Sequence, residues 1–134
     1  VTPHDARRAF DAGADALVVS NHGGRQHDVG ESTVHSLLEL REALGDDPLL
    51  FLDSGARTGA DVACALAAGA DFVFLGRTFM YGVCALGAAG GSHTISMVGR
   101  QLRQVMEQVG CVTPGELRGR RYAWSGPPGR AASD

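Results

Sequence analysis

ALVVSNHGGRQ, at residues 16–26, joins a short apolar run to a polar, glycine-rich loop. A continuous apolar run of this length predicts a strand that is buried on both faces, as in a parallel sheet. The same pattern returns in LLFL followed by DSGARTG, at residues 49–52 and 53–59, and in FVFL followed by GR, at residues 72–75 and 76–77. The sequence therefore predicts three buried strands, each leading into a polar loop.

Helical patterns alternate with these apolar runs. The first helix is expected to open at Thr2 and Pro3, with Asp5 in the position of a capping-box acid, and to end at Gly13. Further helices are expected over about 32–44, 60–68, 78–86 and 92–109. The apolar faces expected of the first two helices are Ala6, Ala9 and Phe10, and Val34, Leu37 and Leu38. This alternation indicates an α/β fold with right-handed crossovers.

The segments before the first and third apolar runs resemble each other. Residues 5–15 read DARRAFDAGAD, and residues 61–71 read DVACALAAGAD. The echo is consistent with a repeated strand–helix unit of about 28 residues, near the ~31 residues per unit of a (β/α)8 barrel. It is also explained by a generic helix-to-strand turn, because glycine caps helices and aspartate favours turns.

The number of strands points to part of a larger barrel. Three strands cannot close a barrel, and an incomplete barrel has an unpaired edge. We therefore expect residues 1–117 to form part of a (β/α)8 barrel (a TIM barrel). The segment 118–134, rich in Arg, Gly, Pro and Ser, is expected to be a disordered tail.

The composition narrows the functional classes. The 134-residue chain has a formal net charge of −3, which argues against a nucleic-acid partner. All 12 basic residues are arginine, so the chain offers no lysine for a Schiff base or a phosphate loop. Three cysteines without a CxxC pair favour reduced thiols in a cytoplasmic protein, and no apolar run is long enough for a membrane span.

His22 and Arg25 are the candidate reactive residues of the first loop. A histidine followed by glycine can be approached closely by a ligand and can act as an acid or base near neutral pH. The nearby arginine can hold a carboxylate through two parallel hydrogen bonds. The pair suggests a proton acceptor beside an anion clamp, although both side chains could instead bind neighbouring backbone.

The loop SNHGGRQ, residues 20–26, strongly resembles the signature of the FMN-dependent 2-hydroxy acid oxidase and dehydrogenase family. This family includes glycolate oxidase, lactate oxidase, flavin L-lactate dehydrogenase and mandelate dehydrogenase. The resemblance implies that His22 is the catalytic base beside flavin mononucleotide (FMN), that Arg25 binds the substrate carboxylate, and that Ser20 contacts the flavin. It also implies that the chain is the C-terminal portion of the barrel, with its last three strands. His27 stands where the family usually has leucine.

The second and third loops are candidate phosphate sites. Gly55 allows backbone N–H groups to face an anion, Arg57 adds positive charge, and the helix that opens near Gly59 has a dipole that favours phosphate. DSGARTG also resembles the family's FMN-binding motif D-[GS]-G-x-R-x-G, which implies that Asp53 contacts the ribityl chain. The cofactor-binding residues implied by the resemblance are Ser20, Asp53, Ser54, Gly55, Ala56, Arg57, Gly76 and Arg77.

The implied reaction is oxidation of a small 2-hydroxy carboxylate to the 2-oxo acid by a homo-oligomeric enzyme. Arg25 would hold the carboxylate, and His22 would remove a proton while two electrons pass to FMN. Removal of the hydroxyl proton and removal of the α-proton both fit. The family's lysine near flavin N1, and its active-site tyrosine and aspartate, precede the matched residues, so we expect the chain alone not to turn over substrate.

Other functions remain open at this point. Barrels that resemble inosine monophosphate dehydrogenase or type 2 isopentenyl diphosphate isomerase share the phosphate loops, but SNHGGRQ separates them. A truncated fragment without activity is a second alternative. A metal cluster of His22, His27, Asp28 and His35 is a third, but its spacing fits no standard site, and we expect no metal. Arg77 could also form a salt bridge at the start of a helix.

Overall fold

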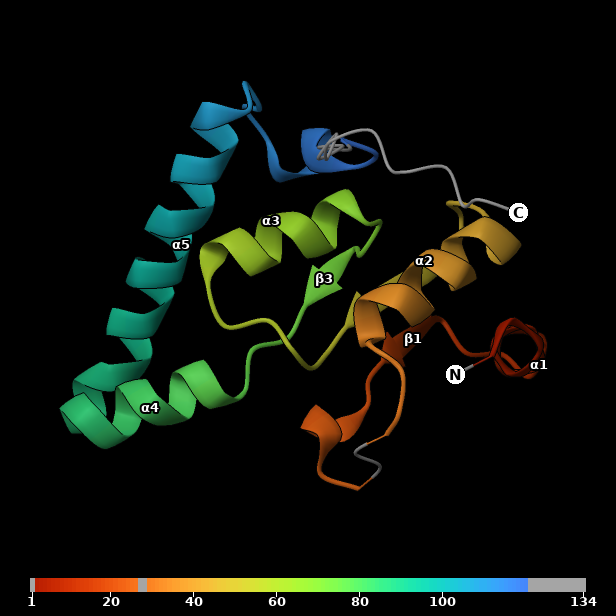
Figure 1. The fold of residues 1–134 in the computed structure, drawn as a ribbon, viewed down its shortest axis with the longest axis horizontal. Coiled ribbons are helices and arrows are strands. Elements are labelled where there is room, and N and C mark those ends of the chain that lie inside the picture. Colours follow the sequence, from red (N-terminus) through yellow and green to blue (C-terminus); the bar gives the residue numbers. More distant parts are fainter. Residues whose placement is uncertain (1, 27–28, 121–134) are drawn as a thin grey trace, which may run out of the picture.

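The computed structural model describes residues 2–26 and 29–120, and its elements alternate as the sequence predicts. They are α1 (Pro3–Asp11), β1 (Ala16–Val19), the 3₁₀ turn η1 (His22–Gly24), α2 (Thr33–Leu44), β2 (Leu49–Leu52), α3 (Gly59–Ala67), β3 (Phe72–Val73), α4 (Arg77–Leu86), η2 (Gly87–Ala89), α5 (Gly90–Gln108) and η3 (Pro114–Leu117). The chain is elongated, with α1 at one end and α4 and α5 at the other (Figure 1).

The three strands form one parallel sheet in the order β1-β2-β3. Val19 aligns with Leu52, and Leu52 aligns with Val73. Because parallel strands end at the same edge of a sheet, the three loops that follow them lie close together. The strand predicted at 72–75 is shorter than expected, although the Phe74 N–H still donates to the Leu52 carbonyl at 2.8 Å.

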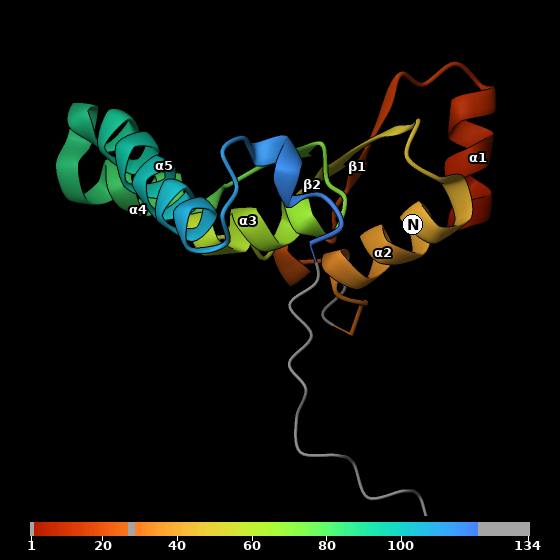
Figure 2. The same ribbon diagram turned by 90° about the horizontal axis from the view of Figure 1, so that it is seen from above.

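Helices α2 and α3 pack on one face of this sheet (Figure 2). Leu37 and Leu40 of α2 are completely buried against the strands. The prediction that Val34 and Leu38 share this buried face is wrong, because they are 38% and 45% exposed. Each helical residue advances by about 100°, so a helix that points Leu37 and Leu40 at the sheet turns Val34 and Leu38 aside. Ala6 of α1 joins the core as expected.

The other face of the sheet is open in the described residues. Phe51, Phe72 and Phe74 lie on it with edge-to-face ring contacts, and their ring centroids are 5.1–6.3 Å apart. Phe72 is 53% exposed, and Val18 on β1 is 49% exposed. The prediction of strands buried on both faces is therefore wrong for these residues. In a closed barrel this face is filled by side chains from strands across the interior, which three strands cannot supply.

Helices α1 and α3 share one set of terminal contacts, which explains the sequence echo. Each begins with a threonine whose hydroxyl oxygen accepts from the backbone N–H three residues later, Thr2 from Asp5 and Thr58 from Asp61. Each ends at a glycine with positive φ, +99° at Gly13 and +105° at Gly69. Both helices therefore end in the same kind of glycine turn, which leads the chain into the next strand. A repeated strand–helix unit and a generic helix-to-strand turn both account for this similarity.

The amino-terminal edge of the sheet is held by ion pairs around Asp71. This carboxylate accepts from Arg41 at 2.6 Å, from the Leu50 N–H at 2.8 Å, and from Arg118. Arg118 also pairs with Asp46 at 3.2 Å. Arg118 thus has defined contacts, whereas most of the tail predicted from residue 118 lies in 121–134, outside the described residues.

Close glycine contacts fix α5 against α3 and α4. A Cβ on Gly59 would lie 2.3 Å from the Leu102 nitrogen and 2.4 Å from the Val98 oxygen, both backbone atoms of α5. A Cβ on Gly82 of α4 would lie 2.1 Å from the hydroxyl of buried Thr94. Among the helices that the structure describes, none is long and apolar enough to cross a membrane.

Replacing Gly59 by alanine should destabilise the fold. Backbone atoms of α5 cannot move aside without separating the two helices, so overpacking should lower the free energy of unfolding of Gly59→Ala by about 1–3 kcal/mol. Gly99→Ala, on α5 with no atom within 4 Å of the new Cβ, is the matched control. It should be neutral or stabilising by up to about 1 kcal/mol. Urea unfolding followed by circular dichroism measures both, and equal midpoints would contradict the packing argument.

Candidate functional site

A pocket of about 250 Å³ lies where the three strand-to-helix loops meet. It receives residues from all three loops, so the two guanidinium groups predicted for phosphate and the predicted base open onto the same cavity. The predicted residues that line it are His22, Arg25, Asp53, Ser54, Gly55, Ala56, Arg57, Gly76 and Arg77. Ser20 does not line it; Ser20 lines a neighbouring cavity and hydrogen-bonds Asp53 at 2.5 Å.

The histidine loop has an unusual backbone. His22, Gly23 and Gly24 have φ values of +57°, +70° and +73°. Glycine adopts such values readily, whereas a histidine there is strained and must be held by its surroundings. Asn21 contributes by accepting the Gly24 N–H on its side-chain oxygen at 3.2 Å. The loop therefore presents an exposed imidazole from a backbone fixed by specific contacts.

A carboxylate and two hydroxyls supply further contacts. Asp53 accepts hydrogen bonds from the Ser20 hydroxyl at 2.5 Å and from the Ser54 hydroxyl at 3.2 Å. The Ser20 hydroxyl accepts from the His22 N–H at 3.0 Å, and the Ser54 hydroxyl accepts from the Gly23 N–H at 2.9 Å. Residues that follow β2 therefore hold the loop that follows β1.

The amino-terminal end of α3 is already occupied, contrary to its predicted use as a phosphate site. Asp61 accepts from the backbone N–H groups of Arg57 and Thr58 at 3.0 and 2.9 Å. Gln101 of α5 accepts from the Gly59 N–H at 2.9 Å. A phosphate at this end would meet a carboxylate and find these donors in use. The sequence placed Asp61 in a helix echo but did not show that its carboxylate turns back onto Arg57.

The pKa of the Asp61 carboxyl reflects these contacts. Partial burial raises the pKa. Hydrogen bonds from the Arg57 N–H and from the hydroxyl and N–H of Thr58, together with the charge of Arg57, lower the pKa by more than burial raises it. The net pKa lies below the ordinary value of 3.8, so Asp61 is an anion at neutral pH.

The amino-terminal end of α4, in contrast, is open. No side chain caps it at Gly76, and within the described residues the N–H groups of Gly76 and Arg77 have no acceptor. The same holds for the N–H groups of Gly55 and Ala56 across the pocket. Unused N–H groups at a helix end, beside glycines without side chains, form a natural site for an anion.

Arg57 and Arg77 add positive charge beside these donors. Neither forms an ion pair with another described residue, so both guanidinium groups can face a ligand. The Arg77 guanidinium lies over the histidine loop, with one nitrogen 3.4 Å from the position of a Cβ on Gly23. Thr78 fixes the Arg57 backbone by donating its hydroxyl to the Arg57 carbonyl at 2.9 Å.

Three further residues line the pocket that the sequence analysis did not select: Gly23, Phe74 and Met80. Phe74 could have been found, because it lies two positions after Phe72 and alternation places both on one face of the strand. Met80 lies one turn into α4, and its position in the pocket depends on how that helix is oriented. Phe74 and Met80 add apolar side chains to a lining that is otherwise mostly polar.

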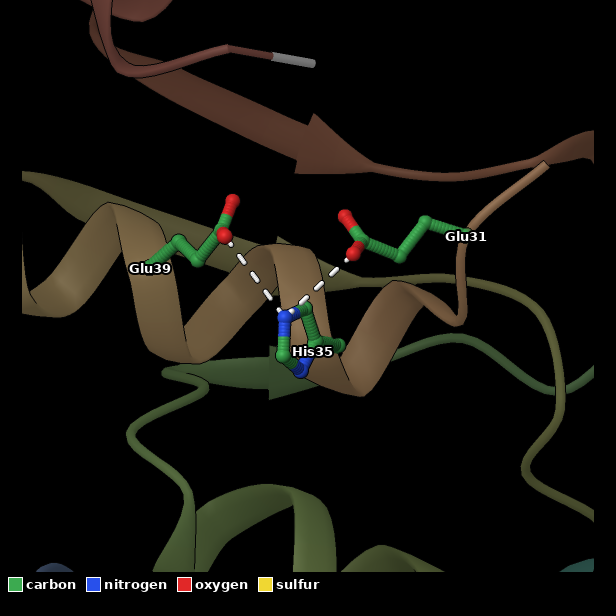
Figure 3. Close-up of side chains that lie close together, drawn as sticks. All are labelled: Glu31, His35 and Glu39. Carbon is green, nitrogen blue, oxygen red and sulfur yellow. Dashed lines mark ion pairs between the residues drawn. The ribbon is translucent and has the colours of Figure 1, made fainter. Parts of the chain in front are cut away.

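His35 does not join a cluster with the pocket residues but pairs with Glu39 on α2 and with Glu31 just before it (Figure 3). Its Nε2 lies 3.3 Å from a Glu31 oxygen and 3.5 Å from a Glu39 oxygen, and all three side chains are about half exposed. Such i,i+4 pairs are common on solvated helix faces and contribute little stability. The other two residues considered with it, His27 and Asp28, lie outside the described residues.

The parallel sheet and its donor-rich pocket define the class as part of a (β/α)8 barrel with a site at the carboxyl ends of its strands. The fold is similar to a mandelate oxidase solved with benzoyl-formic acid, with a TM-score of 0.84, 38% identity, and coverage of 89% of this chain and 36% of that chain. A family model described as FMN-dependent dehydrogenase matches residues 1–124, and the chain belongs to that family.

Two curated relatives agree with this assignment. An L-lactate dehydrogenase of Serratia proteamaculans (strain 568) is 44% identical over 115 residues, which are 86% of this chain and 30% of the relative. A peroxisomal (S)-2-hydroxy-acid oxidase of Oryza sativa subsp. japonica is 42% identical over 117 residues, which are 87% of this chain and 32% of the relative. The chain thus spans about a third of the length of these relatives.

Asp61→Asn should weaken the cap of α3 in a pH-dependent way. The carboxylate binds fewer protons in the folded than in the unfolded state, so its stabilising effect is complete above pH 3.8 and is lost as the pH falls through the lowered pKa. At neutral pH Asp61→Asn should reduce the free energy of unfolding by about 0.5–1 kcal/mol. Near pH 3 the difference from wild type should shrink, because asparagine resembles the protonated acid.

Urea unfolding at pH 7 and pH 3 measures this difference. Asp47→Asn is the control, because Asp47 is exposed and has no hydrogen bond within the described residues. A penalty for Asp61→Asn that is the same at both pH values would show that the charge of Asp61 does not act on α3.

Proposed function

We propose that this chain supplies the FMN-binding and substrate-binding part of an enzyme that oxidises a small 2-hydroxy carboxylate to the 2-oxo acid. One observation carries the proposal: the pocket joins a histidine and an arginine from the loop after β1 to two arginines and unused N–H groups from the loops after β2 and β3. The family match and the names of the relatives support the same chemistry.

The phosphate of FMN would bind between Arg57, Arg77 and the open end of α4. Guanidinium groups hold phosphate through paired hydrogen bonds, and the N–H groups at Gly55 and Gly76 add donors that carry no side chain in the way. Asp53 and Ser54 lie further along the pocket wall, toward the histidine loop, where the ribityl chain would pass. Ser20 would orient the Asp53 carboxylate by donating its hydroxyl to it.

His22 and Arg25 would act on the substrate. Arg25 would bind the carboxylate and so fix the orientation of the α-carbon, while the His22 imidazole would take one proton from the substrate. FMN, when bound, would supply the acceptor for the two electrons and for the second hydrogen that the substrate loses. Phe74 and Met80 offer an apolar wall that keeps water from the reacting atoms.

The remaining parts of the proposal concern assembly and location. We propose a homo-oligomer, because the exposed apolar residues of α4 outside the pocket include Tyr81 and Val83, at 61% and 50%. We propose a cytoplasmic enzyme, since its three cysteines form no disulfide in the described residues.

Arg77→Gln should weaken binding of FMN but not of riboflavin, which lacks the phosphate. Loss of a charge-assisted hydrogen bond should raise the Kd for FMN about 10- to 100-fold and leave that for riboflavin within about twofold. Flavin fluorescence titration of the complete protein measures both constants. Arg103→Gln, an exposed arginine on α5, should change neither. Equal losses for both flavins would remove Arg77 from the phosphate site.

His22→Asn should abolish most turnover without loss of FMN. Asparagine tolerates positive φ but cannot take a proton at neutral pH, so the loop should keep its shape while turnover falls about 10²- to 10⁴-fold. Anaerobic bleaching of bound flavin by glycolate, lactate and mandelate measures the reaction in the complete protein. His93→Asn, an exposed histidine of α5, is the control. If no 2-hydroxy acid bleaches the wild-type flavin, the proposed reaction is wrong.

A further inference from the structure

We propose that the Ser54 hydroxyl is a positioning group for His22, which holds the histidine loop in its left-handed conformation and couples it to the loop after β2. The inference rests on the proposed function and deepens it. It gives Ser54 a role in the shape of the loop, beyond its predicted contact with FMN. No atom of Ser54 needs to touch the substrate for this role.

The histidine loop needs an external support. From His22 to Gly24 three successive residues have positive φ, and the first of them carries a side chain. L-residues avoid this region because the Cβ approaches the following carbonyl oxygen, so a free loop would leave it. The conformation persists only where neighbouring groups hold the backbone.

The Ser54 hydroxyl is one of three side-chain groups that hold it, together with those of Ser20 and Asn21. It accepts the Gly23 N–H at 2.9 Å, in the middle of the left-handed segment, while Ser20 holds the His22 N–H at 3.0 Å. Both hydroxyls donate to the same Asp53 oxygen. A hydroxyl that donates to Asp53 still has lone pairs to accept a backbone N–H, and the two hydroxyl oxygens lie 3.3 Å apart.

Ser54 keeps its own strained backbone to reach this contact. Its φ is +80°, a value that glycine would adopt without strain. Its carbonyl accepts the hydroxyl of buried Thr33 at 3.1 Å, which fixes the residue to α2. A serine at this φ costs backbone energy that a glycine would avoid. We infer that the hydrogen bond from the Gly23 N–H to the Ser54 hydroxyl compensates for that cost.

The Ser54 hydroxyl connects the proposed phosphate end of the loop after β2 with the histidine loop after β1. Ser54 precedes Gly55 and Ala56, which line the pocket and whose N–H groups have no acceptor among the described residues. The Ser54 hydroxyl joins the second loop directly to the Gly23 backbone, next to His22. Ser20 gives a parallel link through Asp53, because its hydroxyl accepts the His22 N–H and donates to the Asp53 carboxylate.

Two variants separate positioning from a structural role. Ser54→Gly removes the hydroxyl and relieves the backbone strain, whereas Ser54→Ala removes the hydroxyl and keeps the strain. The glycine variant should therefore melt at a higher temperature than the alanine variant. Both should nevertheless lose kcat about 10- to 100-fold in the complete protein when it is saturated with FMN, with the KM for the 2-hydroxy acid within about twofold of wild type.

Activity that follows the melting temperature, with Ser54→Gly equal to wild type, would overturn the proposal. Ser92→Ala is the control, because it removes an exposed hydroxyl that donates only to the Ala89 carbonyl. It should change neither kcat nor the histidine loop.

Amide exchange provides a readout that does not depend on the reaction. Exchange of the Gly23 N–H, followed by NMR, should speed up about tenfold in both Ser54 variants and not in Ser92→Ala. If the wild-type protein oxidises no 2-hydroxy acid, the proposed function fails, and the exchange rates alone then decide whether Ser54 holds the loop. An unchanged Gly23 exchange rate would refute the positioning role whatever the activity.

Discussion

The parallel alignment of Val19, Leu52 and Val73 is the constraint on which the site depends. Backbone hydrogen bonds between adjacent strands fix where each strand ends, so the loops after them open at the same edge of the sheet. A shift of one residue would turn Asp53 to the other face of the sheet and separate it from Ser20. The contact between Ser20 and Asp53, at 2.5 Å, exists only in the observed register.

Two helix ends near the site have opposite roles. At α3, Asp61 and Gln101 use the backbone donors, which stabilises the helix and its contact with α5. At α4 the donors beside Gly76 remain available within the described residues. A helix end can serve either its own stability or a ligand, because each N–H group donates to only one strong acceptor at a time. The fold thus uses the donors at the end of α3 for stability and leaves those at the end of α4 without an acceptor among the described residues.

The open face of the sheet explains why the site is one part of a larger structure. The rings of Phe51, Phe72 and Phe74 pack against one another by edge-to-face contacts but remain partly exposed. An apolar surface of this kind is stable when a second layer covers it, and in a (β/α)8 barrel that layer is the rest of the strand ring. The relatives, of which the chain spans about a third, have the additional length that such a ring requires.

The sequence by itself determined the alternation of elements, the strands at 16–19 and 49–52, the helix caps, and the loops that carry His22, Arg25, Arg57 and Arg77. These follow from local patterns, because apolar runs, threonine caps and glycines act on neighbouring residues. Only the tertiary structure decided that Gln101 of α5 accepts the Gly59 N–H at the start of α3, that Ser54 supports Gly23, and that Val34 and Leu38 face outward. Those outcomes depend on contacts between residues distant in sequence and on the rotation of whole helices, which no local pattern encodes.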